Sequence, residues 1–93
     1  MRLPEWARKD NAAKLKFFVQ TMAVFYSRDC TAVNLTDAAG LHYNTVLASQ
    51  ERGRMSKRVA TALTSTAAGS GVKAIWLIAP ELIELDENGE ITR

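Results

Sequence analysis

The sequence predicts a small all-α domain, and three observations support that fold class. Apolar residues recur at the three- and four-residue spacing of helices over most of the first 80 positions. Residues that cap helix N-termini precede several of these runs, and glycine or proline follows them. A chain of 93 residues is long enough for one compact domain and too short for two separate cores.

The first predicted helix spans residues 11–27, with Asp10 as its N-cap. Its large apolar side chains fall on one face at helical spacing. Such an aromatic-rich face can also serve as a partner groove, but this spacing favours packing in the core. The residues that we expect in the core are Leu15, Phe18, Val19, Met22, Phe25 and Tyr26.

Two short helices follow, with a glycine turn between them. Thr31 is placed to cap a helix over residues 32–39, which carries Val33 and Leu35 and is ended by Gly40. The next helix begins at Tyr43 and extends to about residue 50.

Two further helices complete the predicted body. Ser56 can cap a helix over residues 57–68, which the Gly-Ser-Gly stretch at 69–71 ends. A last helix over residues 72–79 is ended by Pro80. The inward side chains that we expect are Val59, Ala60, Leu63 and Ala67 in the fourth helix and Ile75, Trp76 and Ile78 in the fifth.

After Pro80 the pattern changes to an approximate alternation of apolar and acidic residues. Asn88-Gly89 is typical of a tight hairpin turn, so the sequence predicts a short C-terminal strand or hairpin. A frayed acidic tail is the alternative. We therefore divide the chain into a helical domain at 1–80 and a tail at 81–93, which is a candidate dimerisation element.

The charges are unevenly distributed along the chain. Residues 1–80 contain eleven Lys and Arg against five Asp and Glu, whereas residues 81–93 contain one Arg against five acids. The net charge of +2 is thus the sum of +6 and −4. A basic body with an acidic tail suits a polyanion-binding face, although small domains also scatter charge in this way.

Several classes of function find no support in the sequence. One His and one Cys cannot supply a catalytic triad or a dedicated metal site, and the acidic pairs lie only in the tail. We expect no enzyme, no cofactor, no metal and no small-molecule ligand. The single cysteine, Cys30, cannot form an internal disulfide and is expected to be a packed thiol.

The chain contains no apolar run long enough to span a membrane, and its start lacks the pattern of a signal peptide. We therefore expect a cytoplasmic protein with no membrane association.

The run from Thr31 to Arg54 resembles the helix-turn-helix of phage Cro and repressor-type (XRE-like) regulators. In that family an apolar residue lies five positions before the turn glycine, another follows the glycine directly, and a β-branched residue comes six positions after it. Leu35, Gly40, Leu41 and Val46 match this spacing. The glycine supplies a positive φ for the turn and the apolar residues hold the two helices together.

The run departs from the family pattern at two positions. Thr36 takes the place of the usual small residue, and Ser49 stands where an apolar residue is expected. We expect Leu47 or the segment that follows to fill the gap at Ser49.

The resemblance covers roughly residues 12–80 and implies a five-helix Cro/repressor-like domain that regulates transcription as a homodimer on double-stranded DNA. The second helix of the motif would lie in the major groove. The expected base contacts are His42, Tyr43, Asn44, Thr45 and Ala48, and the expected phosphate contacts are Arg52, Arg54, Lys57 and Arg58.

For two residues the sequence leaves alternatives open. His42 can instead act only as the helix N-cap, and Leu47 either packs in the core or contacts a thymine methyl group. A second hypothesis for the whole chain is a small protein-interaction module, such as an antitoxin or anti-repressor. It would use the acidic tail or surfaces around Phe17, Phe25 and Trp76.

Overall fold

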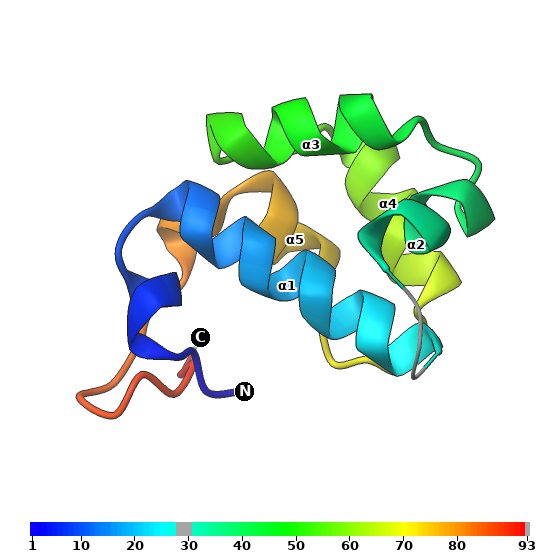
Figure 1. Ribbon diagram of the computed structural model, residues 1–93. Helices are drawn as coiled ribbons and strands as arrows, with labels where there is room; N and C mark the ends of the chain where they lie inside the picture. Colours follow the sequence, from blue (N-terminus) through cyan, green and yellow to red (C-terminus); the bar gives the residue numbers. More distant parts are fainter. Residues whose placement is uncertain (28–30, 93) are drawn as a thin grey trace.

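A computed structural model of the chain describes residues 1–27 and 31–92 (Figure 1). Cys30 and its two predecessors lie outside the described residues. The described part is built from helices, with no strand assigned in it, so the prediction of an all-α fold is confirmed. In chain order the helices are η1 (Glu5–Arg8), α1 (Asn11–Tyr26), α2 (Ala32–Ala38), α3 (Tyr43–Arg52), α4 (Lys57–Thr66), α5 (Ala74–Ile78) and η2 (Pro80–Leu82), where η marks a 3-10 helix.

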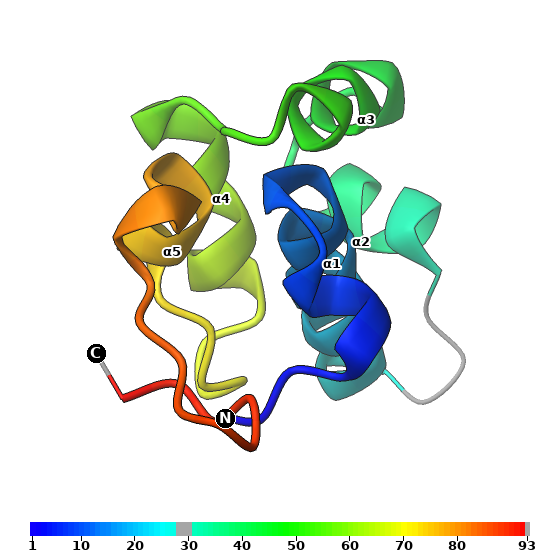
Figure 2. The same ribbon diagram turned by 90° about the vertical axis from the view of Figure 1, so that its left-hand side faces the viewer.

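The helices form two layers with a third element across one end. Figures 1 and 2 together show α1 and α2 on one side of the molecule and α4 and α5 on the other. Helix α3 lies across the end of the molecule that is remote from the two termini. The core between the layers contains fully buried side chains such as Leu15, Met22 and Leu63.

The three predicted caps are confirmed. The side chain of Asp10 accepts a hydrogen bond from the backbone N–H of Ala13 at 2.8 Å. Thr31 and Ser56 cap α2 and α4 in the same way. The predicted helix ends were less accurate, because α4 ends at Thr66 and α5 covers only Ala74–Ile78. The two 3-10 helices were not predicted, since three or four residues carry too little periodicity to detect.

Three side chains that we expected in the core are instead exposed. Phe25 is 54% exposed, because it lies at the C-terminal end of α1, where Ala23 occupies the buried position instead. Its ring lies against Gly69 in the loop after α4. The other two are Tyr26 at the same helix end and Ile75 on the outer face of α5; Val33, on the outer face of α2, is exposed as well. The inward stripe of α4 is confirmed, with Val59, Ala60, Leu63 and Ala67 all buried.

The acidic tail folds back on the start of the chain rather than forming a hairpin of regular strands. It makes two isolated bridges, Arg2 with Glu90 and Leu85 with Ile91. The N–H of Leu3 donates to the carbonyl of Gly89 at 2.8 Å, and the N–H of Ile91 donates to that of Met1 at 2.8 Å. One edge of the tail is therefore already occupied by residues 1–3 of the same chain.

A charged side chain organises the turn within this tail. The carboxylate of Asp86 accepts the backbone N–H groups of Asn88 at 2.8 Å and Glu90 at 2.9 Å. These hydrogen bonds hold the pKa of Asp86 below its ordinary value, and the bond from Glu90 contributes most. Desolvation of the carboxylate raises the pKa in opposition, whereas the positive charge of Arg8 lowers it further. Arg8 also donates to the carbonyls of Leu3 and Asn88, which ties η1 to both ends of the chain.

Two glycines with similar backbone angles provide a matched test of packing. Gly40 has a φ of +73° and an added Cβ would meet nothing within 4 Å, whereas Gly53 has a φ of +81° and its Cβ would lie 3.0 Å from the Cβ of Asn11. We expect Gly40→Ala to lower the free energy of unfolding by about 1 kcal/mol, from backbone strain alone. Gly53→Ala should cost about 2–4 kcal/mol, since it adds a steric conflict with α1.

Urea unfolding of both variants measures the difference between them. If both variants lose the same free energy of unfolding, a Cβ at position 53 does not meet Asn11 of α1, and the two helices are further apart there.

Candidate nucleic-acid interface

Helix α3 is held at both ends by its neighbours along the chain. Gly40 adopts the positive φ that the sequence predicted, and the N–H of Leu41 donates to the carbonyl of Thr36 at 2.9 Å. At the other end Gly53, in the left-handed conformation, ends the helix. Leu35 and Val46 are buried where α2 and α3 meet. The two short helices and the glycine turn are thus present as the sequence predicted.

The two departures from the helix-turn-helix pattern are buried polar residues whose side chains have partners. Thr36 is fully buried and its hydroxyl donates to the carbonyl of Val33 at 2.8 Å. Ser49 is 3% exposed, and its hydroxyl accepts a hydrogen bond from Arg52 at 3.3 Å. Met55, in the segment after α3, is buried as well. The segment after α3 therefore contributes Met55 to the core, whereas Leu47 is only half-buried.

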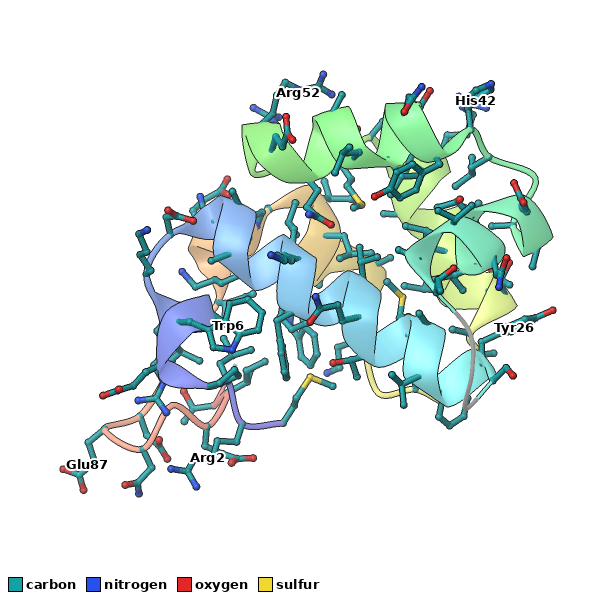
Figure 3. All side chains as sticks on the ribbon, in the orientation of Figure 1. Arg2, Trp6, Tyr26, His42, Arg52 and Glu87 are labelled. Atoms are coloured by element: carbon teal, nitrogen blue, oxygen red, sulfur yellow. The ribbon has the colours of Figure 1, made fainter. Side chains whose placement is uncertain are left out.

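The outward face of α3 presents a continuous row of exposed residues. Asn44, Thr45 and Ala48 are exposed, and Ala48 lies four positions after Asn44 and three after Thr45, so the three residues share this face. His42 precedes them at the N-cap position and is also exposed, but its side chain makes no cap hydrogen bond. His42 therefore occupies the N-cap position of α3, as one alternative predicted, and its side chain is not engaged in capping. Figure 3 shows His42 and Arg52 at the two ends of α3, both on the side away from the body.

Tyr43 and Leu47 do not belong to this row. Both are half-buried and turn toward α1, where they line a groove between the two helices. Tyr43, which we expected among the base contacts, therefore lies on the flank of α3 and not in the exposed row. Leu47 lies neither in the core nor on the outward face.

The four cations that the sequence singled out are all exposed. Arg52 ends α3, Arg54 follows it, and Lys57 and Arg58 begin α4. Figure 2 shows the beginning of α4 beside α3 at the same end of the molecule. In residues 1–27 and 31–92 the sole ion pair joins the ammonium of Met1 to Glu90, so none of these four cations is neutralised by a described carboxylate. They form a basic patch, defined here as Arg52, Arg54, Lys57 and Arg58.

The acidic tail lies far from the basic patch. Residues 84–92 pack beside residues 1–3, at the end of the molecule opposite α3 (Figure 1). The separation of charge along the sequence is therefore also a separation in space. A polyanion that approached α3 would not meet the acidic tail on the same face.

The groove between α1 and α3 contains further polar residues that the sequence did not single out. Trp6, Lys9, Lys16 and Gln50 line it together with Tyr43, and its volume is about 600 Å³. These residues come from the segment of η1 and α1 and from α3, and at least 27 positions separate the two groups. No local sequence signal could bring them together, because only the packing of α3 on α1 does so.

The surfaces expected for a protein partner are only partly available. Trp76 is 8% exposed and stacks on Phe18, so the expectation that it forms a docking surface is wrong. Phe17 is half-buried and Phe25 is exposed. Within the described residues, no cluster of three His, Cys, Asp or Glu side chains could hold a metal ion, and no helix has the length and apolar character needed to cross a membrane.

Comparison of the chain with protein-family models, with curated proteins and with solved structures gave no match. The geometry of α3 and the basic patch is therefore the support for the candidate interface.

Proposed function

We propose that this protein is a sequence-specific transcriptional regulator of the phage repressor type, which reads double-stranded DNA by placing α3 in the major groove. The observation that carries this proposal is the combination of an exposed face on α3 with unpaired cations beside its C-terminal end. A major groove about 12 Å wide admits one helix, and cations beside that helix reach the flanking phosphates.

Each residue of the interface has a role that suits its chemistry. Asn44 can pair through its amide with the N6 and N7 edge of adenine, and the methyl group of Ala48 can contact a thymine methyl. Thr45 and His42 lie within the same exposed row and would contact bases or the backbone. Tyr43, at the flank of α3, is better placed for a phosphate than for a base. Arg54, Lys57 and Arg58 would bind phosphates.

We propose further that the protein binds as a homodimer, as dimeric helix-turn-helix proteins read two half-sites one helical turn apart. One edge of the tail is occupied by residues 1–3, which leaves other surfaces for the contact between subunits. Ile75 of α5 and Leu82 of η2 are exposed apolar side chains that offer such a surface, at 51% and 64% exposure.

Selection from a random duplex library at near-physiological salt tests the proposed function. An enriched inverted repeat, with half-site centres about 10–10.5 bp apart or a multiple of this, would support a dimeric reader of the major groove. If the bound pool is no more enriched than that of a protein with His42, Asn44 and Thr45 replaced by Ala, the proposed function is wrong.

Substitution of Asn44 tests the role of the exposed row. Asn44→Ala should weaken binding to the selected sequence by about 1–3 kcal/mol and leave binding to unrelated DNA nearly unchanged, because it removes a base contact only. Asn88→Ala is a matched control, since it removes an exposed amide from the acidic tail. Equal losses on selected and unrelated DNA would contradict the base contact at Asn44.

One feature favours a second candidate, a protein-interaction module. The outer side of α1 bears a shallow groove of about 360 Å³ formed by Trp6, Phe17 and Val24 with three uncharged neighbours. Trp6 is 46% exposed and Val24 is 63% exposed. A protein that used only this surface would bind DNA no more tightly than about 10⁻⁴–10⁻⁶ M at physiological salt, without sequence preference.

A further inference from the structure

We infer that Lys9 and Lys16, in the groove between α1 and α3, bind the sugar-phosphate strand on the side of α3 that lies opposite the basic patch. The inference rests on the proposed function and adds to it a second backbone contact. The DNA would then be held on both sides of α3, whereas the sequence indicated cations on one side only.

The groove borders the whole length of the reading helix. Its lining from α3 comprises Tyr43, Leu47, Gln50 and Glu51, which recur every three or four residues along one flank. A smaller hollow continues it toward Ala32 and shares the side chain of Lys16. Anything that lies along this flank of α3 therefore passes Lys16.

The polar groups of the groove match the chemistry of a phosphate backbone. Lysine ammonium, glutamine amide and tyrosine hydroxyl groups are among the common donors to DNA phosphates. Lys9 and Lys16 are exposed and form no ion pair with any carboxylate in residues 1–27 and 31–92. Asp10 lines the same groove, but its carboxylate already accepts the N–H of Ala13 as the cap of α1. Neither ammonium group is held in an ion pair, although the carboxylate of Asp10 keeps its negative charge in the same groove.

The arrangement of the helices places the groove and the basic patch on different sides of α3. Helix α1, which carries Lys16, packs beneath α3 in the layer opposite α4 (Figure 2). The basic patch begins at the end of α3 and continues into α4. Because a sugar-phosphate strand flanks each side of the major groove, a helix lying in the groove has one strand on each flank. Lys9 and Lys16 face one of these strands, and the basic patch faces the other.

Two acidic residues, Asp10 and Glu51, line the groove as well, and their carboxylates would repel a phosphate bound there. Glu51 is exposed and makes no cap hydrogen bond, so it can be replaced without loss of a helix cap. Replacement of Glu51 by Gln should therefore strengthen DNA binding, while replacement of Lys9 and Lys16 by Gln weakens it.

The experiment measures the affinity of the full chain for its selected duplex as a function of salt. Each phosphate contact contributes about 0.9 to the slope of log affinity against log salt, so Lys9→Gln with Lys16→Gln should reduce the slope by about 1.8. Between about 50 and 200 mM salt, the affinity of the wild-type chain should therefore fall by about 12-fold more than that of the double variant. Lys73→Gln is the control. Lys73 lies over the ring of Trp76 and lines a different hollow, together with Met1 and Thr92.

The results separate this inference from the proposed function. A shallower slope for the lysine double variant, tighter binding by Glu51→Gln and no change of slope for Lys73→Gln would support the contact. An unchanged slope in a double variant whose circular dichroism and selected sequence match the wild type would overturn it and leave the proposed function intact. A wild-type chain that selects no sequence would remove both together.

Discussion

Replacement of Arg54, Lys57 and Arg58 by Gln should reduce the salt slope of DNA binding by about 2.7, the largest effect on binding that we expect. Each of these cations is exposed and has no carboxylate partner among the described residues, so each can release one counterion when it binds a phosphate. Between about 50 and 200 mM salt, the wild-type affinity should fall by about 40-fold more than that of the triple variant. Binding to unrelated DNA should show the same change, because phosphate contacts carry no sequence information.

The triple variant should fold at least as well as the wild type. Lys57 and Arg58 lie in the first turn of α4, where the helix dipole disfavours positive charge. Their replacement by a neutral residue should therefore raise the free energy of unfolding slightly, by a few tenths of a kcal/mol. A loss of DNA affinity without loss of stability would separate binding from folding. It would also explain why cations occupy a position that is unfavourable for the isolated helix.

A control with the same change of net charge tests whether position matters. Lys73→Glu combined with Arg2→Gln also lowers the net charge by three, and both residues lie near the chain termini, far from α3. We expect this control to reduce the slope much less than the triple variant. If both variants reduce it equally, the effect comes from net charge and the basic patch is not a contact surface.

The local features of this fold were predictable from the sequence because short-range interactions determine them. Asp10, Thr31 and Ser56 cap helices through the N–H group three residues further on, and Gly40 takes the positive φ that a turn between helices requires. These features depend on only a few neighbouring residues. The positions of α1 to α4 along the chain followed from them together with the helical period.

Features that depend on tertiary packing were not predictable in the same way. Phe25 and Leu15 fall within one expected apolar face of α1, yet only Leu15 is buried, because the end of α1 extends beyond the core. The tail was expected to pair with itself or with another subunit; Leu85 does form an isolated bridge with Ile91, and residues 1–3 occupy one edge of the tail, which the sequence did not predict. The residues of the exposed row on α3 followed from the resemblance to the helix-turn-helix pattern, which also included Tyr43, a residue that the structure places on the flank. Lys9 and Lys16 were missed, because their place beside α3 depends on how α1 packs.

The largest loss of stability that we expect concerns the core between the two layers of helices. Phe18 of α1 is fully buried and stacks on Trp76 of α5, with ring centroids 5.5 Å apart and an angle of 26° between the planes. This contact joins the two layers. The adjacent Leu77 accepts the N–H of Met55 at 2.9 Å, so α5 in turn holds the segment between α3 and α4. Phe18 thus supports the positions of Arg54 and Lys57 without contacting them.

Phe18→Ala should lower the free energy of unfolding by about 3–5 kcal/mol, because it leaves a cavity between the layers and removes the stacking with Trp76. Phe25→Ala is a matched control: it removes the same ring from the same helix at a position that is 54% exposed, and it should cost less than about 1 kcal/mol. Urea unfolding followed by tryptophan fluorescence measures both, since Trp76 reports the loss of its partner.

A loss of this size is a large share of the total stability of a small domain, so Phe18→Leu provides a milder variant that should still fold. Because Phe18 acts through α5 and the segment before α4, Phe18→Leu should weaken DNA binding by the same factor on selected and unrelated sequences. It should do so without the change of salt slope that loss of a phosphate contact produces. Similar losses of stability in Phe18→Ala and Phe25→Ala would contradict this account, because the two rings would then be equally buried.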